Sequence, residues 1–181
     1  MNQVTNIFLI SDTHFNHANI LKFTNLAGQQ TRPEFGNLDE MNEHIIDRWN
    51  SVVGENDLVY HLGDVYFGKQ NNEASNRSIL RRLKGKKHLI LGNHDDAKDP
   101  VLHEFFDKIT MWHYLRDHGM TLSHIPLHET TLNESRHGEK ALNIHGHIHR
   151  NPSPSKRHIN VSVEQINYTP VAVEDAPRII R

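Results

Sequence analysis

The sequence of 181 residues contains no cysteine, so it forms no disulfide bond and offers no thiolate ligand to a metal. It has no apolar run close to the ~20 residues that a membrane-spanning helix needs. Its start, MNQVTNIFLISD, lacks the basic and apolar regions of a secretory signal. Lys and Arg number 20 against 22 Asp and Glu, so charge alone demands no polyanionic partner. We therefore expect a cytoplasmic protein with one domain over residues 1–181.

Histidine is the residue type in excess, with 16 copies in the chain. Three of them crowd into the stretch LNIHGHIHR at 142–150. On an extended backbone His145, His147 and His149 would share one face, because side chains alternate along a strand. Gly146 would instead let the chain turn between them. Either this face is polar and wet, or it holds something that needs neutral nitrogen donors.

Five short apolar runs end in glycine or polar residues, which is typical of buried strands. They cover residues 4–10, 58–62, 88–91, 120–122 and 141–144. Between them, the pattern predicts helices over 38–53, capped by Asn37, over 73–83, and from Asp99-Pro100 onwards. Strands that alternate with helices indicate an α/β fold. The C-terminal residues are predicted to form a peripheral strand and a tail.

Side chains that can bind metals follow each of these runs. They are Asp12 and His14 in DTH, Asp64 in GD, Asn93 and His94 in GNHD, His124 in SHIP, and His147 and His149 in GHIH. Ligands of α/β proteins gather beyond the carboxyl ends of strands, so we expect these side chains at one rim. Imidazole and carboxylate donors suit Zn, Mn, Fe or Ni. Two such ions ~3.5–4 Å apart would clamp a phosphoryl group and generate hydroxide from a shared water.

The ordered motifs resemble those of the calcineurin-like metallophosphoesterases, which are D-x-H, G-D, G-N-H-[DE], H and G-H-x-H. All five are present in this order between Asp12 and His149. Each motif alone has an ordinary explanation as a turn or a surface histidine, but five in order are specific. The resemblance implies a fold of two packed mixed β-sheets flanked by helices, an α/β/β/α sandwich.

The resemblance also implies a role for each matching residue. The implied ligands are Asp12, His14 and His149 for one ion, Asn93, His124 and His147 for the other, and Asp64 as the bridge. A metal-bridging hydroxide would attack phosphorus, while His94 would protonate the leaving oxygen or help to bind the phosphoryl group together with Asn93. The cofactors would be two divalent ions, with Mn expected ahead of Fe, Zn, Ni or Co.

The substrate class is less defined than the metal centre. The acid and the arginine that follow the bridging Asp in Ser/Thr protein phosphatases are absent from Val65-Tyr66-Phe67-Gly68. The chain is instead similar to the small bacterial or phage-type phosphoesterases, and Asp95 or a backbone carbonyl would have to orient His94. Because the compact chain has little room for a cap, we favour a phosphodiesterase acting on a small phosphoester or a nucleotide. A phosphomonoesterase, a nucleic-acid-processing enzyme and a non-catalytic metal- or phosphate-binding module stay open, and nucleic acid is not the favoured partner.

Several further residues have competing interpretations. His17 would either contact substrate or cap the next helix, at 18–23. His61 and His145 are expected to be buried supporting histidines. Arg32 and the loop at 150–158 are the basic candidates for gripping an anionic substrate; the side chains of that loop are Arg150, Lys156, Arg157 and His158. A second basic run, from Arg77 to Lys87, is expected to be a solvated face.

Overall fold

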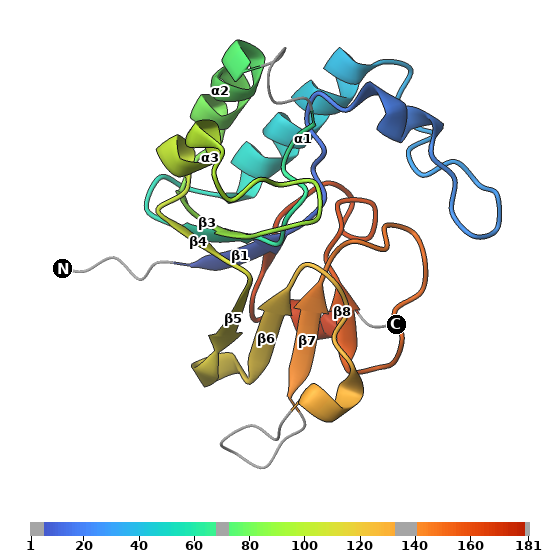
Figure 1. The fold of residues 1–181 in the computed structure, drawn as a ribbon, viewed down its shortest axis with the longest axis vertical. Coiled ribbons are helices and arrows are strands. Elements are labelled where there is room, and N and C mark those ends of the chain that lie inside the picture. Colours follow the sequence, from blue (N-terminus) through green and yellow to red (C-terminus); the bar gives the residue numbers. More distant parts are fainter. Residues whose placement is uncertain (1–5, 68–72, 133–140, 180–181) are drawn as a thin grey trace.

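The computed structural model describes residues 6–67, 73–132 and 141–179. Its strands form two sheets, one of five strands in the order β4-β3-β2-β1-β9 and one of four in the order β5-β6-β7-β8 (Figure 1). The first comprises β1 Ile7–Ile10, β2 Leu58–His61, β3 Lys86–Ile90, β4 Lys108–Thr110 and β9 Val171–Ala172. The second comprises β5 Trp112–Leu115, β6 Met120–Ser123, β7 Leu142–His145 and β8 His158–Asn160.

Both sheets are mixed, as expected for this fold. Strand β9 runs antiparallel to β1, and β5 runs antiparallel to β6, whereas the other neighbours are parallel. The five strands predicted from apolar runs correspond to β1, β2, β3, β6 and β7. Residues 4 and 5 of the first run, and Gly68, lie outside the described residues. The prediction did not include β4, β5 or β8, whose patterns are short or polar.

Three α-helices lie together on one side of the first sheet (Figure 1). They are α1 Leu38–Val52, α2 Glu73–Arg82 and α3 Pro100–Phe105. The predicted caps form, because the side chain of Asn37 accepts the amide of Glu40 and that of Asp99 accepts the amide of Val101, both at 2.9 Å. These side chains satisfy amides that have no partner inside their helix. The expected flanking helices are thus confirmed for the first sheet.

Four 3₁₀ helices complete the described elements. They are η1 Ala18–Lys22, η2 Arg116–His118, η3 Glu129–Thr131 and η4 Ala176–Arg178. One cluster of buried apolar side chains extends over both sheets and the inner face of α1. Within it Trp49 is fully buried, and its indole N–H donates to the carbonyl of Lys84 at 3.0 Å. Among the described residues, no helix is long and apolar enough to span a membrane.

The two sheets meet where β1 ends. The amide of Ser11, the residue after β1, donates to the carbonyl of Val161, just past β8, at 2.9 Å. An isolated parallel bridge pairs Ser11 with Ser162. The carboxyl ends of strands from both sheets therefore open onto one rim, where the predicted ligands lie.

Candidate metal centre

The loops at this rim have an unusual backbone. Five residues predicted as ligands have positive φ angles between 48° and 70°; they are Asp12, His14, Asp64, His147 and His149. For a residue with a side chain this left-handed conformation costs roughly 1–2 kcal/mol, and such strain concentrates at functional sites. The extended backbone considered for the three histidines after residue 144 is wrong beyond His145, where β7 ends. The chain turns at Gly146, so the three rings do not share a strand face.

Two motif glycines are required by close approach of the backbone to carboxylates. A Cβ atom on Gly146 would lie 2.0 Å from Oγ of Ser11 and 2.1 Å from Oδ2 of Asp12. A Cβ atom on Gly92 would lie 2.2 Å from Oδ1 of Asp64. No side chain fits at either position without displacing a carboxylate, so the observed positions of the two carboxylates require glycine at both places.

Three of the predicted ligands form an inner cluster, which we define as Asp12, His14 and His149. Their donor atoms all lie within 4.8 Å of one another. Oδ1 of Asp12 is 3.9 Å from Nε2 of His14 and 4.0 Å from Nε2 of His149. Nε2 of His14 is buried and has no hydrogen-bond partner among the described residues. A buried polar atom without a partner needs an explanation, and a metal ion at this point supplies one.

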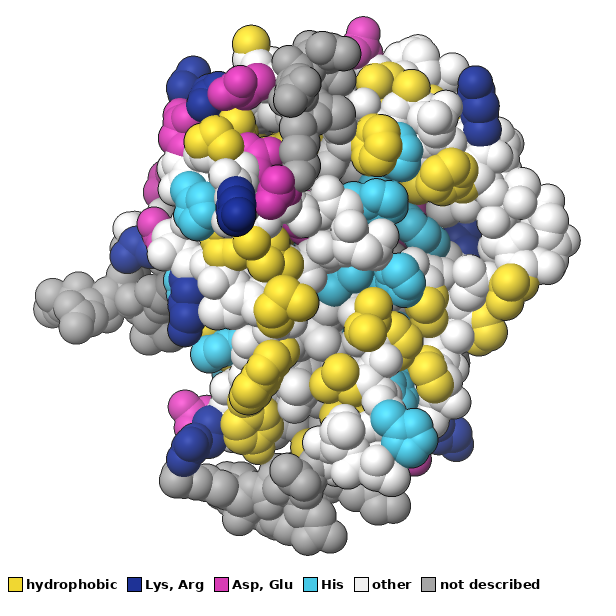
Figure 2. Space-filling model, viewed as in Figure 1, with side chains coloured by type: hydrophobic (Ala, Val, Ile, Leu, Met, Phe, Trp, Pro, Cys, Tyr) yellow, Lys and Arg dark blue, Asp and Glu magenta, His cyan; other side chains and the backbone are white. Residues whose placement is uncertain are grey.

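An outer cluster, defined as Asn93, His124 and His147, lies beside it. Nε2 of His124 is 3.0 Å from Oδ1 of Asn93 and 3.2 Å from Nδ1 of His147. Asp64 stands between the clusters: its Oδ2 is 3.3 Å from Nε2 of His124 and 3.6 Å from Nε2 of His14. Figure 2 shows histidine side chains gathered in the middle of this face of the molecule.

Hydrogen bonds at Nδ1 orient Nε2 of one histidine toward each cluster. Nδ1 of His124 donates to the carbonyl of Leu62 at 2.7 Å, and Nδ1 of His149 lies 3.0 Å from a carboxylate oxygen of Glu164. Nε2 of each ring therefore points toward the centre without a proton when the ring is neutral. Metal-binding histidines are commonly oriented in this way. The donor set of imidazole nitrogens and carboxylate oxygens fits divalent transition metals.

Charges at the rim differ between the two clusters. Burial, then the positive charge of Arg32, holds the pKa of His14 well below its usual range, so this ring is neutral. Burial acts to lower the pKa of His124, but the hydrogen bond to Asp64 and the nearby acids raise it to about 9. Burial acts to raise the pKa of Asp64, but His124 lowers it. Asp64 and His124 thus form an ion pair between the two clusters.

The sequence-based predictions missed Glu164 and misplaced Arg32. One carboxylate oxygen of Glu164 accepts from Nε of Arg32 at 2.8 Å and from His149. Arg32 is fully buried, and it also donates to the main-chain carbonyls of Asp12 and Thr13. Burial opposes ionisation of Glu164, but Arg32 and His149 lower its pKa to about 2. Arg32 was one candidate for contact with an anionic substrate, but its buried guanidinium is engaged with Glu164 and with the main chain of the first motif.

Asp95 has a different role from the one considered for it. Its carboxylate accepts the backbone amides of Gly92 and Asp64 at 2.8 Å, and that of Val65 at 3.0 Å. It therefore ties two motif loops together and does not orient the ring of His94. The amide of His94 donates to Oδ1 of Asp64 at 2.9 Å. Its exposed ring lies 5.6 Å from that of His14, measured between ring centroids.

The ring of His17 contacts that of His14. The two Nδ1 atoms are 3.1 Å apart, and the ring of His17 stacks on that of Phe67 at 4.2 Å. Burial lowers the pKa of His17 to about 4, which keeps the ring neutral. His17 precedes η1, but its side chain makes no capping hydrogen bond, so the alternative that it caps this helix is wrong, and its contact with substrate stays a prediction. Its ring fixes the orientation of His14.

The two predicted supporting histidines are confirmed as buried side chains. His61 lies 2.9 Å from Oγ1 of Thr13 and accepts the amide of Gly63 at 3.2 Å, and burial lowers its pKa to about 3. Nδ1 of His145 donates to the carbonyl of Gly146 at 2.9 Å, and burial lowers its pKa to about 4. Both rings brace the loops that carry the ligands.

The loop at 150–158 is mostly structural. Arg150 donates to the carbonyl of Thr31 and forms an ion pair with Glu34, while Arg157 donates to two main-chain carbonyls. His158 is buried and donates to the carbonyl of Leu127. These contacts disfavour the three side chains as candidates for gripping an anionic substrate, and only Lys156 of the four is exposed.

The basic run from Arg77 to Lys87 is mainly a solvated face with ion pairs, as expected. Arg82 binds both carboxylate oxygens of Glu43 at 2.6 Å, and Arg77 pairs with Glu73 and Glu104. The exception is Lys87, which is buried and donates to two main-chain carbonyls. Ion pairs of this kind on an exposed helix contribute little stability.

Several known proteins resemble this chain in sequence or in fold. Residues 5–174 match the family model described as calcineurin-like phosphoesterase. The uncharacterized protein MJ1445 of Methanocaldococcus jannaschii is 40% identical over 181 aligned residues, covering 96% of this chain and 90% of that protein. The Gene 66 protein of Mycobacterium phage L5 is 28% identical, covering 87% and 83%. Over 97% of this chain and 100% of the other, the fold matches the crystal structure of the protein of unknown function AQ665 from Aquifex aeolicus, with a TM-score of 0.72 and 28% identity.

Proposed function

The chain belongs to the calcineurin-like phosphoesterase family, as its motifs predicted, and on this basis we propose that it hydrolyses phosphodiesters with a pair of divalent metal ions. Membership supports metal-dependent phosphoester hydrolysis in general. The proposal adds the ligands, the proton donor and the preference for diesters.

The proposed ligands follow the two clusters. The inner cluster would hold one ion and the outer cluster the other, with Asp64 shared between them. The observation that carries this proposal is the position of Asp64, whose Oδ2 atom lies 3.6 Å from a donor of the inner cluster and 3.3 Å from a donor of the outer cluster. A carboxylate can serve two ions, whereas a single imidazole nitrogen serves one. The mixed nitrogen and oxygen donors suit Mn, Fe, Zn, Ni or Co, and we propose Mn.

The protein's own groups would complete the reaction around these ions. Bound divalent ions supply Lewis acidity and a water molecule of lowered pKa. The exposed ring of His94 lies beside the centre, with its backbone fixed by Asp64, so it can reach a substrate above the rim. We assign His94 the transfer of a proton to the departing oxygen. Asn93, in the outer cluster, would also contact the phosphoryl group.

The surroundings of the centre favour a diester over a monoester. A monoester carries a second negative charge, which needs additional cationic groups beside the metals. Arg32 and Arg150, two of the arginines considered for substrate contact, are both held by carboxylates and carbonyls. A diester, with its single charge, matches this arrangement better.

Turnover by metal-free protein refilled with one metal at a time tests the proposal. The substrates are bis(p-nitrophenyl) phosphate and p-nitrophenyl phosphate, each with Mn, Fe, Zn, Ni or Co. We expect turnover with Mn to be the fastest and the diester to be preferred. A strong preference for the monoester would reverse the assignment of substrate class. Metal uptake without turnover of either ester would point to a binding module.

A further inference from the structure

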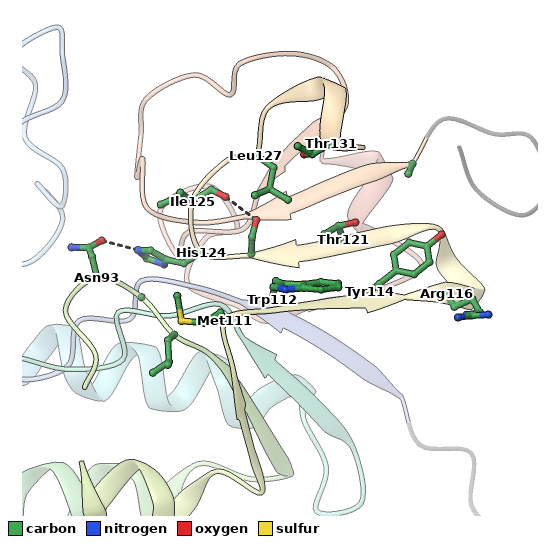
Figure 3. A pocket seen from close by; sticks show the side chains of 14 residues that line it. Asn93, Met111, Trp112, Tyr114, Arg116, Thr121, His124, Ile125, Leu127 and Thr131 are labelled. Atoms are coloured by element: carbon green, nitrogen blue, oxygen red, sulfur yellow. Dashed lines mark hydrogen bonds between the residues drawn. The ribbon is translucent and has the colours of Figure 1, made fainter. Parts of the chain in front are cut away.

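A groove of about 990 Å³ begins at the outer cluster and runs across the second sheet. Figure 3 shows Asn93 and His124 at one end and Arg116 at the other, with Trp112 and Tyr114 between them. The metal centre and the groove therefore share residues. A substrate whose phosphorus lay at the centre could extend directly along this surface.

The floor of the groove is an aromatic strip. Trp112 and Tyr114 are two residues apart on β5, so they face the same side of the sheet. Their partners across the ladder to β6 are Ser123 and Thr121, which also line the groove. Trp112 is 62% exposed. Large aromatic side chains that remain this exposed on a sheet face commonly mark a binding surface.

The remaining lining adds apolar and cationic character. Met111 and Ile125 are 67% and 51% exposed, and both line the groove beside Trp112. Figure 2 shows apolar side chains next to the histidines on this face. Among the described residues the lining includes no carboxylate, and Arg116 forms no ion pair. The groove therefore favours an anionic ligand that also has a flat apolar part.

We propose that this groove binds a nucleoside part of the substrate, whose base stacks on Trp112 and Tyr114 while a further phosphate reaches Arg116. The inference rests on the proposed function, because it places a nucleotidyl phosphodiester at the metal centre. Open aromatic strips on sheets recognise bases by stacking, and every base has a flat π-face for this. An alkyl chain would need enclosure, whereas this floor includes the hydroxyls of Thr121 and Ser123.

Tryptophan fluorescence tests base stacking without any turnover. The chain has only two tryptophans, and Trp49 is fully buried, so quenching by a ligand in the groove reports on Trp112. We expect AMP to quench metal-free protein saturably, and Arg116→Ala to weaken the binding. Trp112→Phe should remove the signal, whereas Leu26→Ala, an exposed apolar control outside the groove, should keep it. Absence of quenching by AMP, or quenching by decyl phosphate at lower concentration, would overturn the proposal.

Kinetics with two diesters that share a leaving group separate this proposal from the proposed function. The Mn-loaded protein should prefer p-nitrophenyl thymidine 5′-phosphate to p-nitrophenyl methyl phosphate. Trp112→Ala should raise the KM for the thymidine ester about 5- to 100-fold, the usual effect of removing a base-stacking ring. It should leave kcat, and the rate on the methyl ester, unchanged.

The combinations of results are decisive. Turnover of both esters with no thymidine preference would overturn the groove assignment and leave the hydrolase intact. Quenching by AMP without turnover of any ester would keep the groove and contradict the hydrolase. Dimers in light scattering that Trp112→Ala converts to monomers, together with no quenching by AMP, would assign the groove to a second copy of the chain and overturn the proposal.

Discussion

The inner and outer clusters offer similar donors in different surroundings. In the inner cluster Asp12 and His14 are almost fully buried, and each ligand is braced by another side chain: Ser162 donates to Asp12, His17 contacts His14, and Glu164 binds His149. In the outer cluster Asn93 and His147 are exposed, and the groove opens beside them. If the proposed pair of ions is bound, we expect the inner cluster to retain its ion, and the outer cluster to contact the substrate and exchange its ion more readily.

Asp64→Asn should have the largest effect on turnover, because the carboxylate of Asp64 lies between the inner and the outer cluster. Loss of the shared charge should reduce turnover to the level of EDTA-treated protein and weaken uptake of both ions. Steady-state kinetics and elemental analysis measure the two effects, with Asp39→Asn on the exposed face of α1 as the matched control. If the variant lost only one ion, the two clusters would not be coupled through Asp64.

His94→Gln should slow turnover by ~10²–10⁴, the usual scale of acid–base assistance, while both ions remain bound. The loss should be greatest for a poor leaving group, which needs a proton most, and smallest for p-nitrophenolate. Comparison of alkyl and aryl leaving groups checks this prediction. A variant as fast as the wild type on an alkyl leaving group would show that His94 is not the proton donor.

Glu164→Gln should act on the inner cluster alone. Removing the partner of a metal-binding histidine typically weakens metal affinity by ~10–100-fold, so the inner ion should be affected and the outer ion should not. The change also leaves the buried charge of Arg32 without its carboxylate, which should cost about 3–5 kcal/mol of unfolding free energy. Calorimetric metal titration and urea unfolding measure these effects.

Glu34→Gln is the matched control for Glu164→Gln, because Glu34 also pairs with an arginine but lies at the exposed edge of the site. It should leave the affinity for both ions unchanged. If Glu164→Gln weakened metal binding equally at both clusters, the inner cluster would not be the one that Glu164 supports, and the distinction between the two clusters would fail.

The affinity for the outer ion should depend on pH. The pKa of His124 is raised to about 9 in the folded protein, so below that pH the ring holds a proton that metal binding must release. Affinity should therefore rise by about tenfold per pH unit as the pH increases from about 6 to 8. Metal titrations in buffers of different pH measure this slope. A pH-independent affinity would mean that His124 is not a ligand.

The same comparison shows what the sequence could predict. The ends of the ligand-bearing strands can be recognised in the sequence, because at each of them an apolar run is followed by charged or imidazole side chains. The five ligand-bearing strands and the caps Asn37 and Asp99 were therefore predictable. The left-handed turns at the ligands were not, since non-glycine residues in this conformation have no reliable pattern.

Residues that support the ligands without belonging to a motif were the hardest to predict. Glu164 lies far from every motif, and only its acidic character within the apolar stretch VSVEQI hints at a buried partner. Arg32 and Arg157 were considered as candidates for substrate contact because a sequence does not show whether a charged side chain points inward. The aromatic strip was missed for a similar reason: Trp112 and Tyr114 alternate as in any half-buried strand, and only the fold shows that their face opens beside the metal centre.

Anomalous diffraction from crystals of the Mn-loaded protein would show directly whether Asp64 joins two ions. We expect two manganese peaks ~3.5–4 Å apart, one at the inner and one at the outer cluster, with the carboxylate of Asp64 contacting both. A single peak, or two peaks of which Asp64 contacts only one, would contradict this expectation.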